Sequence, residues 1–128
     1  MQGAAPRDEL PLVLLVDDDV ALLRSFERMV RRMPIRLVTA VSGEEALAVI
    51  ARDGPPALLI SDYQLAGMDG LSLLAKVRLQ HPGVRVVLSS GTTKTPATGS
   101  GIGVLPKPVE AEALDHLIAS LDPRGRSG

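Results

Sequence analysis

The stretch LVLLVDDDVALLRSFERMV, residues 12–30, decides the fold of this chain. It opens with five consecutive apolar residues, a run typical of a strand buried on both faces of a parallel sheet. Three carboxylates at 17–19 end that strand. From residue 20 to 32 apolar side chains recur at helical spacing, and Pro34 ends the helix because proline has no backbone N–H. A buried strand that leads directly into an amphipathic helix predicts an α/β domain.

The same alternation continues along the rest of the chain. We expect strands at 12–16, 35–41, 57–61, 84–88 and 102–105. We expect helices at 20–32, 42–53, 71–80 and 109–121. Ser42 and Glu45 form a capping box that starts the second of these helices. The residues expected to face inward in the last helix are Val109, Ala113, Leu114, Leu117, Ile118 and Leu121. Strands that alternate with helices imply right-handed crossovers and one five-stranded parallel sheet with helices on both faces.

Length and composition narrow the class of protein. The 128 residues suit one domain, with a lead-in at 1–10, the globular part at 11–121 and a polar tail at 122–128. A net charge of -1 argues against nucleic acid as a partner, because phosphate contacts need excess lysine and arginine. The chain has no cysteine, which excludes disulfides and thiol chemistry. It has no apolar run long enough for a membrane span and no signal-peptide pattern at 1–9, so we expect a cytoplasmic protein without membrane contact.

Polar side chains follow four of the five predicted strands. In chain order they are Asp17, Asp18 and Asp19, then Asp62, then Ser89 and Ser90, then Lys107. The carboxyl ends of parallel strands meet at one edge of the sheet, where open α/β folds bind ligands. Carboxylates gathered there repel one another unless a cation neutralises them, and an all-oxygen site favours Mg²⁺. An aspartate, Mg²⁺ and a lysine together suit formation of an aspartyl phosphate, with the carboxylate as nucleophile.

Four short motifs give the chain a resemblance to a known family. They are VDDD at 16–19, SDYQLAGMDG at 61–70, SSG at 89–91 and PKP at 106–108. In this order, each after a predicted strand, they resemble the receiver domain of two-component response regulators over residues 12–121. The resemblance implies a flavodoxin-like sheet of order 2-1-3-4-5. It also implies a domain that takes a phosphoryl group from a histidine kinase or histidine phosphotransfer protein and then switches conformation. A homodimer or a covalently linked output domain fits this role, and an enzyme with a separate substrate does not.

The resemblance assigns the phosphorylation chemistry to named residues. Asp62 is the phosphoacceptor, and Lys107 is the cation beside it. Ser90 is the hydroxyl that binds the phosphoryl group, with Ser89 as the alternative register. The bond between Lys107 and Pro108 is a candidate cis peptide, as is usual in the family.

The resemblance also assigns metal ligands and tuning positions. Asp18 and Asp62 bind Mg²⁺ directly, together with the backbone carbonyl of Gln64, and Asp17 helps through water. Mn²⁺ is an acceptable substitute for Mg²⁺. Gln64 and Thr92 lie two residues after the phosphoacceptor and the hydroxyl, where the family tunes autodephosphorylation.

The stretch between the hydroxyl residue and the lysine departs from the family pattern. It is shorter than usual, and GTTKTPATGSG at 91–101 holds three glycines, four threonines and a proline but no large apolar side chain. These are poor helix formers without an apolar stripe, so we predict an irregular, mobile loop at 92–100 and four helices instead of five. Val104 stands in place of the usual aromatic switch residue, and Ala66 replaces a usual proline. We therefore expect the usual coupling route to be absent.

Other interpretations of the same residues stay open. Asp17 and Asp19 have the spacing of a haloacid-dehalogenase-type Mg²⁺-dependent phosphatase, although Ala21 stands where threonine or valine is expected. A pseudo-receiver that only binds partners is the third possibility. The carboxylates at 17–19 also suit a solvated helix N-terminus, and Asp69 suits turn and capping chemistry better than metal binding. The arginines of the first helix are either a solvated face or a partner surface.

Overall fold

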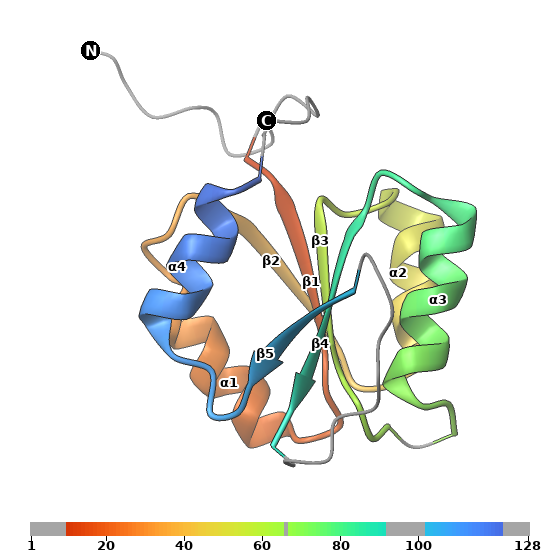
Figure 1. The fold of residues 1–128 in the computed structure, drawn as a ribbon, viewed down its shortest axis with the longest axis horizontal. Coiled ribbons are helices and arrows are strands. Elements are labelled where there is room, and N and C mark those ends of the chain that lie inside the picture. The colour runs from red at the N-terminus through yellow and green to blue at the C-terminus, as the bar shows by residue number, and fades with distance from the viewer. Residues whose placement is uncertain (1–9, 66, 92–101, 122–128) are drawn as a thin grey trace.

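A five-stranded parallel sheet forms the centre of the molecule (Figure 1). The computed structural model describes residues 10–65, 67–91 and 102–121. The strands are β1 (Leu12–Val16), β2 (Arg36–Ala40), β3 (Leu58–Asp62), β4 (Arg85–Ser90) and β5 (Ile102–Pro106). The helices are α1 (Val20–Met29), α2 (Gly43–Asp53), α3 (Gly70–Gln80) and α4 (Ala111–Ala119). The sheet order is β2-β1-β3-β4-β5, which confirms the expected doubly wound, flavodoxin-like fold.

Two apolar cores lie on opposite faces of this sheet, because successive residues of a strand point to opposite sides. Leu14 and Val16 of β1 belong to the core beneath α2 and α3, which also contains Leu59, Leu73, Leu74 and Val77. Val13 and Leu15 belong to the core beneath α1 and α4, which also contains Phe26, Leu58, Ile60 and Leu114. Both layers are visible in Figure 1, with α1 and α4 on one side of the sheet and α2 and α3 on the other. Each fully buried leucine or valine contributes about 1.5–3 kcal/mol, which explains the unbroken apolar run of β1.

Side-chain caps fix where the helices begin. Ser42 caps α2 as expected, because its Oγ accepts a hydrogen bond from the Glu45 N–H at 3.0 Å; Glu45 reaches one residue further back than in a capping box, and its Oε1 accepts from the Val41 N–H at 2.7 Å. Asp69 Oδ1 accepts from the Ser72 N–H at 2.7 Å, so Asp69 caps α3 as expected. Each cap satisfies a backbone donor that the first helical turn leaves without a partner.

The predicted ends of several elements were wrong by a few residues. Helix α1 ends at Met29 instead of residue 32, because the chain turns after Val30 toward β2. Helix α4 runs over 111–119 instead of 109–121, and its Ala113 is exposed rather than facing inward. Strand β2 covers 36–40 instead of 35–41. Strands β3 and β4 continue into the polar residues at their ends, and β5 includes Pro106, because strand pairing depends on backbone groups.

The described residues contain four helices, as predicted. The irregular loop expected at 92–100 lies outside the described residues, as do Ala66, residues 1–9 of the lead-in expected at 1–10 and the tail at 122–128. Among the residues the structure describes, no helix combines the length and apolar character that crossing a membrane requires.

Candidate functional site

The carboxyl ends of four strands bring the predicted site residues together. Asp17 and Asp18 follow β1, Asp62 ends β3, Ser90 ends β4, and Lys107 follows β5. The pairing of β3 with β4 places Asp62 opposite Ser89, and the pairing of β4 with β5 places Ser90 opposite Pro106. The last residues of β3, β4 and β5 therefore lie side by side. Residues that lie far apart in the sequence therefore share one edge of the sheet.

Lys107 joins two carboxylates at this edge. Its Nζ lies 2.8 Å from Asp17 Oδ2 and 3.0 Å from Asp62 Oδ1. Its backbone N–H donates to the Ser90 carbonyl at 3.0 Å, so the strand ladder holds the start of the side chain in place. The Lys107–Pro108 peptide is cis, which confirms the expectation from the resemblance. The lysine side chain is 21% exposed, so its ammonium group acts on these carboxylates in a partly water-shielded setting.

Asp17 is the most firmly held of the carboxylates. Its side chain is 3% exposed. Its Oδ1 accepts a hydrogen bond from the Asp19 N–H at 2.9 Å, while Oδ2 contacts Lys107. Its backbone N–H donates to the Ala40 carbonyl at 3.0 Å. Both carboxylate oxygens are therefore engaged by the protein, whereas the neighbouring Asp18 is exposed.

Three carboxylates form a cluster that could hold a cation. One oxygen each from Asp17, Asp18 and Asp62 lies within 4.8 Å of the others. Burial raises the pKa of Asp62, the charges of Asp17 and Asp18 raise it further, and the hydrogen bond from Lys107 opposes them. Burial alone would lower the pKa of Lys107, but its hydrogen bonds to Asp17 and Asp62 outweigh this and raise it. The lysine thus offsets only part of the negative charge, and the all-oxygen donor set fits a hard divalent cation such as Mg²⁺.

A pocket of about 300 Å³ opens beside Asp62. Its lining residues are Asp62, Tyr63, Gln64, Ser90, Gly91 and Lys107. Ser90 lines this pocket and Ser89 does not, which favours Ser90 between the two serines. The pocket therefore places a carboxylate, an ammonium group and a hydroxyl residue around one space. Thr92 lies outside the described residues.

Comparison with known families identifies this arrangement. The profile of the response regulator receiver domain matches residues 13–119. The chain belongs to this family. It is a phosphoacceptor domain of two-component signalling.

Full-length relatives and solved structures agree with this assignment. The receiver domain is 36% identical over 111 residues to transcriptional regulatory protein GlrR of Escherichia coli, covering 83% of this chain and 25% of GlrR. It is 32% identical over 112 residues to the DNA-binding transcriptional regulator NtrC of Salmonella typhimurium, covering 84% of this chain and 24% of NtrC. The chain thus spans about a quarter of the length of these curated relatives.

Two solved structures show the same architecture. A CheY-like receiver domain protein from Methanospirillum hungatei matches with a TM-score of 0.78 at 27% identity, over 87% of this chain and 92% of that one. A CheY-like receiver domain from Methylobacillus flagellatus matches with a TM-score of 0.81 at 21% identity, over 88% of this chain and 99% of that one, which bears on the fold alone.

Two residues of the receiver site were not found from the sequence. Tyr63 lines the pocket while its ring packs against the core beneath α2 and α3. Gly70, the first residue of α3, donates its N–H to the Tyr63 carbonyl at 2.8 Å. A Cβ added at Gly70 would lie 1.9 Å from the Asp62 carbonyl oxygen, so this close approach requires glycine. The sequence signal for Tyr63 was its position directly after Asp62. The sequence signal for Gly70 was its place at the end of the GMDG turn.

Proposed function

We propose that Asp62 accepts a phosphoryl group from the phospho-histidine of a histidine kinase or histidine phosphotransfer protein. The observation that carries this proposal is the ammonium group of Lys107, which contacts Asp62 Oδ1 at 3.0 Å and Asp17 Oδ2 at 2.8 Å beside the open pocket. A carboxylate next to a fixed cation and a cavity can meet an incoming phosphoryl group with part of its charge already neutralised.

The transfer makes one bond and breaks one. A carboxylate oxygen of Asp62 attacks phosphorus, the P–N bond to the donor imidazole breaks, and its electron pair stays on the imidazole nitrogen. Lys107 then faces the oxygens of the new acyl phosphate, and the Ser90 hydroxyl donates a hydrogen bond to one of them. Hydrolysis reverses the modification, since water attacks phosphorus and releases inorganic phosphate and the Asp62 carboxylate.

The carboxylate cluster suits Mg²⁺ in this role. Its oxygens from Asp17, Asp18 and Asp62 lie within 4.8 Å of one another, and the pocket lining adds Gln64. We assign direct contacts to Asp18, Asp62 and the Gln64 carbonyl, and a water-mediated contact to Asp17. Bound Mg²⁺, or Mn²⁺ in its place, supplies positive charge against the phosphoryl oxygens. Both carboxylate oxygens of Asp17 already accept hydrogen bonds, one from the Asp19 N–H and one from Lys107, which supports a water-mediated contact between Asp17 and the metal.

The domain acts on itself and has no separate substrate. We propose that it catalyses its own phosphorylation and dephosphorylation, with Gln64 and Thr92 tuning the access of water to the acyl phosphate. The phosphorylated form biases a two-state conformation, which a covalently linked output domain or a second copy of the chain would detect. Both named relatives are transcriptional regulators in which the matched part makes up only about a quarter of the length, which supports a linked output domain. The expected cytoplasmic location stays a prediction.

Beryllofluoride, which mimics an acyl phosphate, tests the assignment. With Mg²⁺ present, it should bind one site and perturb the amide resonances around Asp62, Ser90 and Lys107. Asp62→Asn replaces the carboxylate nucleophile by an uncharged amide of nearly the same size and should abolish binding. The matched control Asp69→Asn alters a helix cap outside the pocket and should leave binding intact. Unchanged beryllofluoride binding in Asp62→Asn would refute the proposal.

A further inference from the structure

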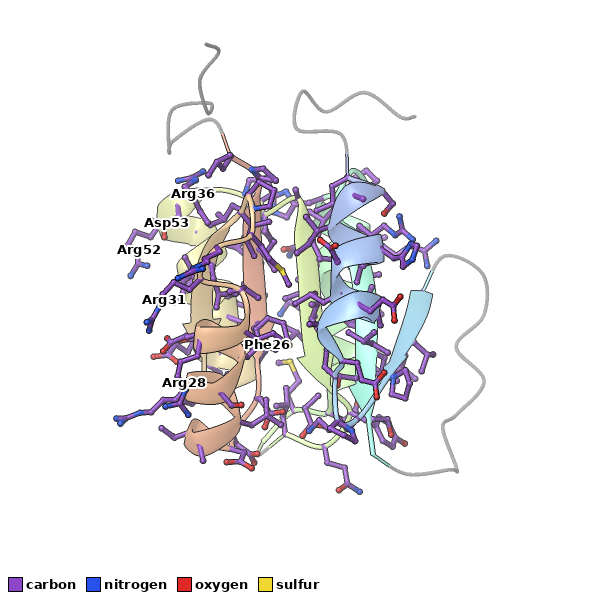
Figure 2. All side chains as sticks on the ribbon, turned by 90° about the vertical axis from the view of Figure 1, so that its left-hand side faces the viewer. Phe26, Arg28, Arg31, Arg36, Arg52 and Asp53 are labelled. Carbon is purple, nitrogen blue, oxygen red and sulfur yellow. The ribbon has the colours of Figure 1, made fainter. Side chains whose placement is uncertain are left out.

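A groove of about 580 Å³ runs between α1 and β2, on the side of the molecule away from α4 (Figure 2). Helix α1 contributes Arg24, Glu27 and Arg28 to its lining, the turn after α1 contributes Arg31, and β2 with the residue after it contributes Thr39 and Val41. The phosphorylation pocket shares no lining residue with this groove. Strand β1 lies between β2 and β3 in the sheet. A molecule bound in the groove would therefore not cover Asp62 at the end of β3.

The groove has a positive charge that the described residues leave uncompensated. Arg24 and Arg28 are four residues apart and lie on one face of α1, and Arg31, in the turn that follows the helix, lines the same groove. Within the ranges that the structure describes, none of these three arginines forms an ion pair. Figure 2 shows Arg28 projecting outward from α1 and Arg31 projecting outward from the turn after it. Glu27 is the one acid in the lining, so the groove has a net charge of two positive units.

Apolar side chains mark the end of the groove nearest the carboxyl ends of the strands. Val20, the first residue of α1, is 50% exposed, and Val41, just after β2, is 42% exposed. A single exposed valine is ordinary on a protein surface. Two of them in one groove, beside a row of arginines, give the mixture of apolar anchor and guanidinium that protein interfaces favour.

We propose that this α1–β2 groove binds an acidic segment of a partner protein, with an apolar side chain of that segment against Val20 and Val41. Charge complementarity selects an acidic partner, because arginine pairs well with carboxylates through its planar fork of donors. The two valines and Glu27 argue for a protein rather than a nucleic acid. Valines offer nothing to a phosphate backbone, and Glu27 repels it. This inference stands apart from the phosphorylation of Asp62, since neither the groove residues nor their charges belong to that site.

Fluorescence anisotropy with synthetic probes tests the proposal. The probes are a fluorescein-labelled peptide of Glu-Glu-Leu triplets, its Gln-Gln-Leu counterpart, a Glu-Glu-Ser counterpart and a short DNA duplex. The Glu-Glu-Leu peptide should bind, and the other two peptides and the DNA should bind more weakly by about tenfold or more. Added salt should weaken the binding, because exposed charges are screened.

Matched variants locate the binding on the surface. Arg28→Glu reverses one charge in the groove and should weaken the binding of the Glu-Glu-Leu peptide by about tenfold. Lys76→Glu makes the same charge change on the exposed face of α3 and should have little effect. Asp62→Asn should bind the peptide as the natural chain does, so a failure of the proposed phosphorylation would leave this result unchanged. Circular dichroism of each variant checks that the fold is kept.

Several results would overturn the inference. One is equal peptide affinity in Arg28→Glu and Lys76→Glu. Another is DNA binding as tight as peptide binding, which would assign the arginines to nucleic acid. A third is self-association of the natural chain in sedimentation that Arg28→Glu abolishes, which would make a second copy the occupant. Equal binding of the Glu-Glu-Leu and Glu-Glu-Ser peptides would refute the role of Val20 and Val41.

Discussion

Replacing Gly70 with alanine should destabilise the protein through a single methyl group. The new Cβ would lie 1.9 Å from the Asp62 carbonyl oxygen, 2.8 Å from its carbonyl carbon and 2.9 Å from Ser61 Oγ. Two of these neighbours are backbone atoms of β3, so no flexible side chain can move aside. Either the start of α3 or the end of β3 must shift.

The size of the effect follows from two opposing contributions. Inserting a methylene into a well-packed site costs about 1–3 kcal/mol in free energy of unfolding. Alanine is a better helix former than glycine by up to about 1 kcal/mol in a helix interior, but Gly70 is the first helical residue, where the gain is smaller. We therefore expect a net loss of about 1–2 kcal/mol, or a fall in Tm of roughly 3–10 °C for a domain of this size.

Thermal unfolding followed by circular dichroism measures this loss. Gly83→Ala is the matched control, because a Cβ at Gly83 meets nothing within 4 Å and its φ is not positive. Gly70→Ala should also weaken beryllofluoride binding, since the displaced backbone belongs to Asp62 itself. Equal Tm values for the two variants would refute the argument from close approach, and so would a Gly70→Ala variant more stable than the natural chain.

Three further predictions concern charge, metal and the undescribed segment. Because burial raises the pKa of Asp62, Asp62→Asn should stabilise the metal-free protein at neutral pH, and this stabilisation should fade as the pH falls from the folded pKa of Asp62 to the ordinary carboxyl pKa. Urea unfolding in the presence of a chelator at several pH values measures the difference in stability, and a difference that does not depend on pH would contradict the prediction. In Mg²⁺ titrations Asp18→Ala should lose more affinity than Asp17→Ala, and Zn²⁺ should not compete at equal concentration; unchanged affinity in Asp18→Ala would exclude it as a ligand. Amide hydrogen exchange should be fast across 92–100 and slow down with beryllofluoride, whereas strong protection in the unmodified protein speaks against an irregular loop.

The sequence was informative about the fold because the three central strands, β1, β3 and β4, are almost completely buried. Runs of four or five apolar residues are stable at the centre of an α/β domain, where helices cover both faces of the sheet. The alternation of these runs with helices along the chain implies parallel crossovers. The element ends were harder to predict. The helical pattern of α1 continues through residue 32, yet the turn into β2 ends the helix at Met29. Strand β4 includes both Ser89 and Ser90, because its ladder with β3 and β5 depends on backbone groups and not on side-chain polarity.

Some features of the site could likewise be predicted from the sequence, and others could not. Its polar residues follow apolar runs, so Asp17, Asp62 and Lys107 could be assigned to one edge of the sheet from the sequence alone. The shared contact of Lys107 with Asp17 as well as Asp62 depends on how deeply Asp17 is buried, and periodicity does not report that depth. The close approach of Gly70 to the Asp62 carbonyl depends on the path of the turn before α3, which no short motif specifies in three dimensions.

Chemical mapping of the phosphoryl group tests the proposed function most directly. The protein is incubated with acetyl phosphate and Mg²⁺, treated with borohydride, which reduces an aspartyl phosphate to homoserine, and mapped by peptide mass spectrometry. We predict homoserine at position 62, no such product in Asp62→Asn, and much less in Lys107→Ala. Homoserine at position 17 would indicate the phosphatase-type alternative, and an unmodified Asp62 in the natural chain under these conditions would contradict a phosphoacceptor at this residue.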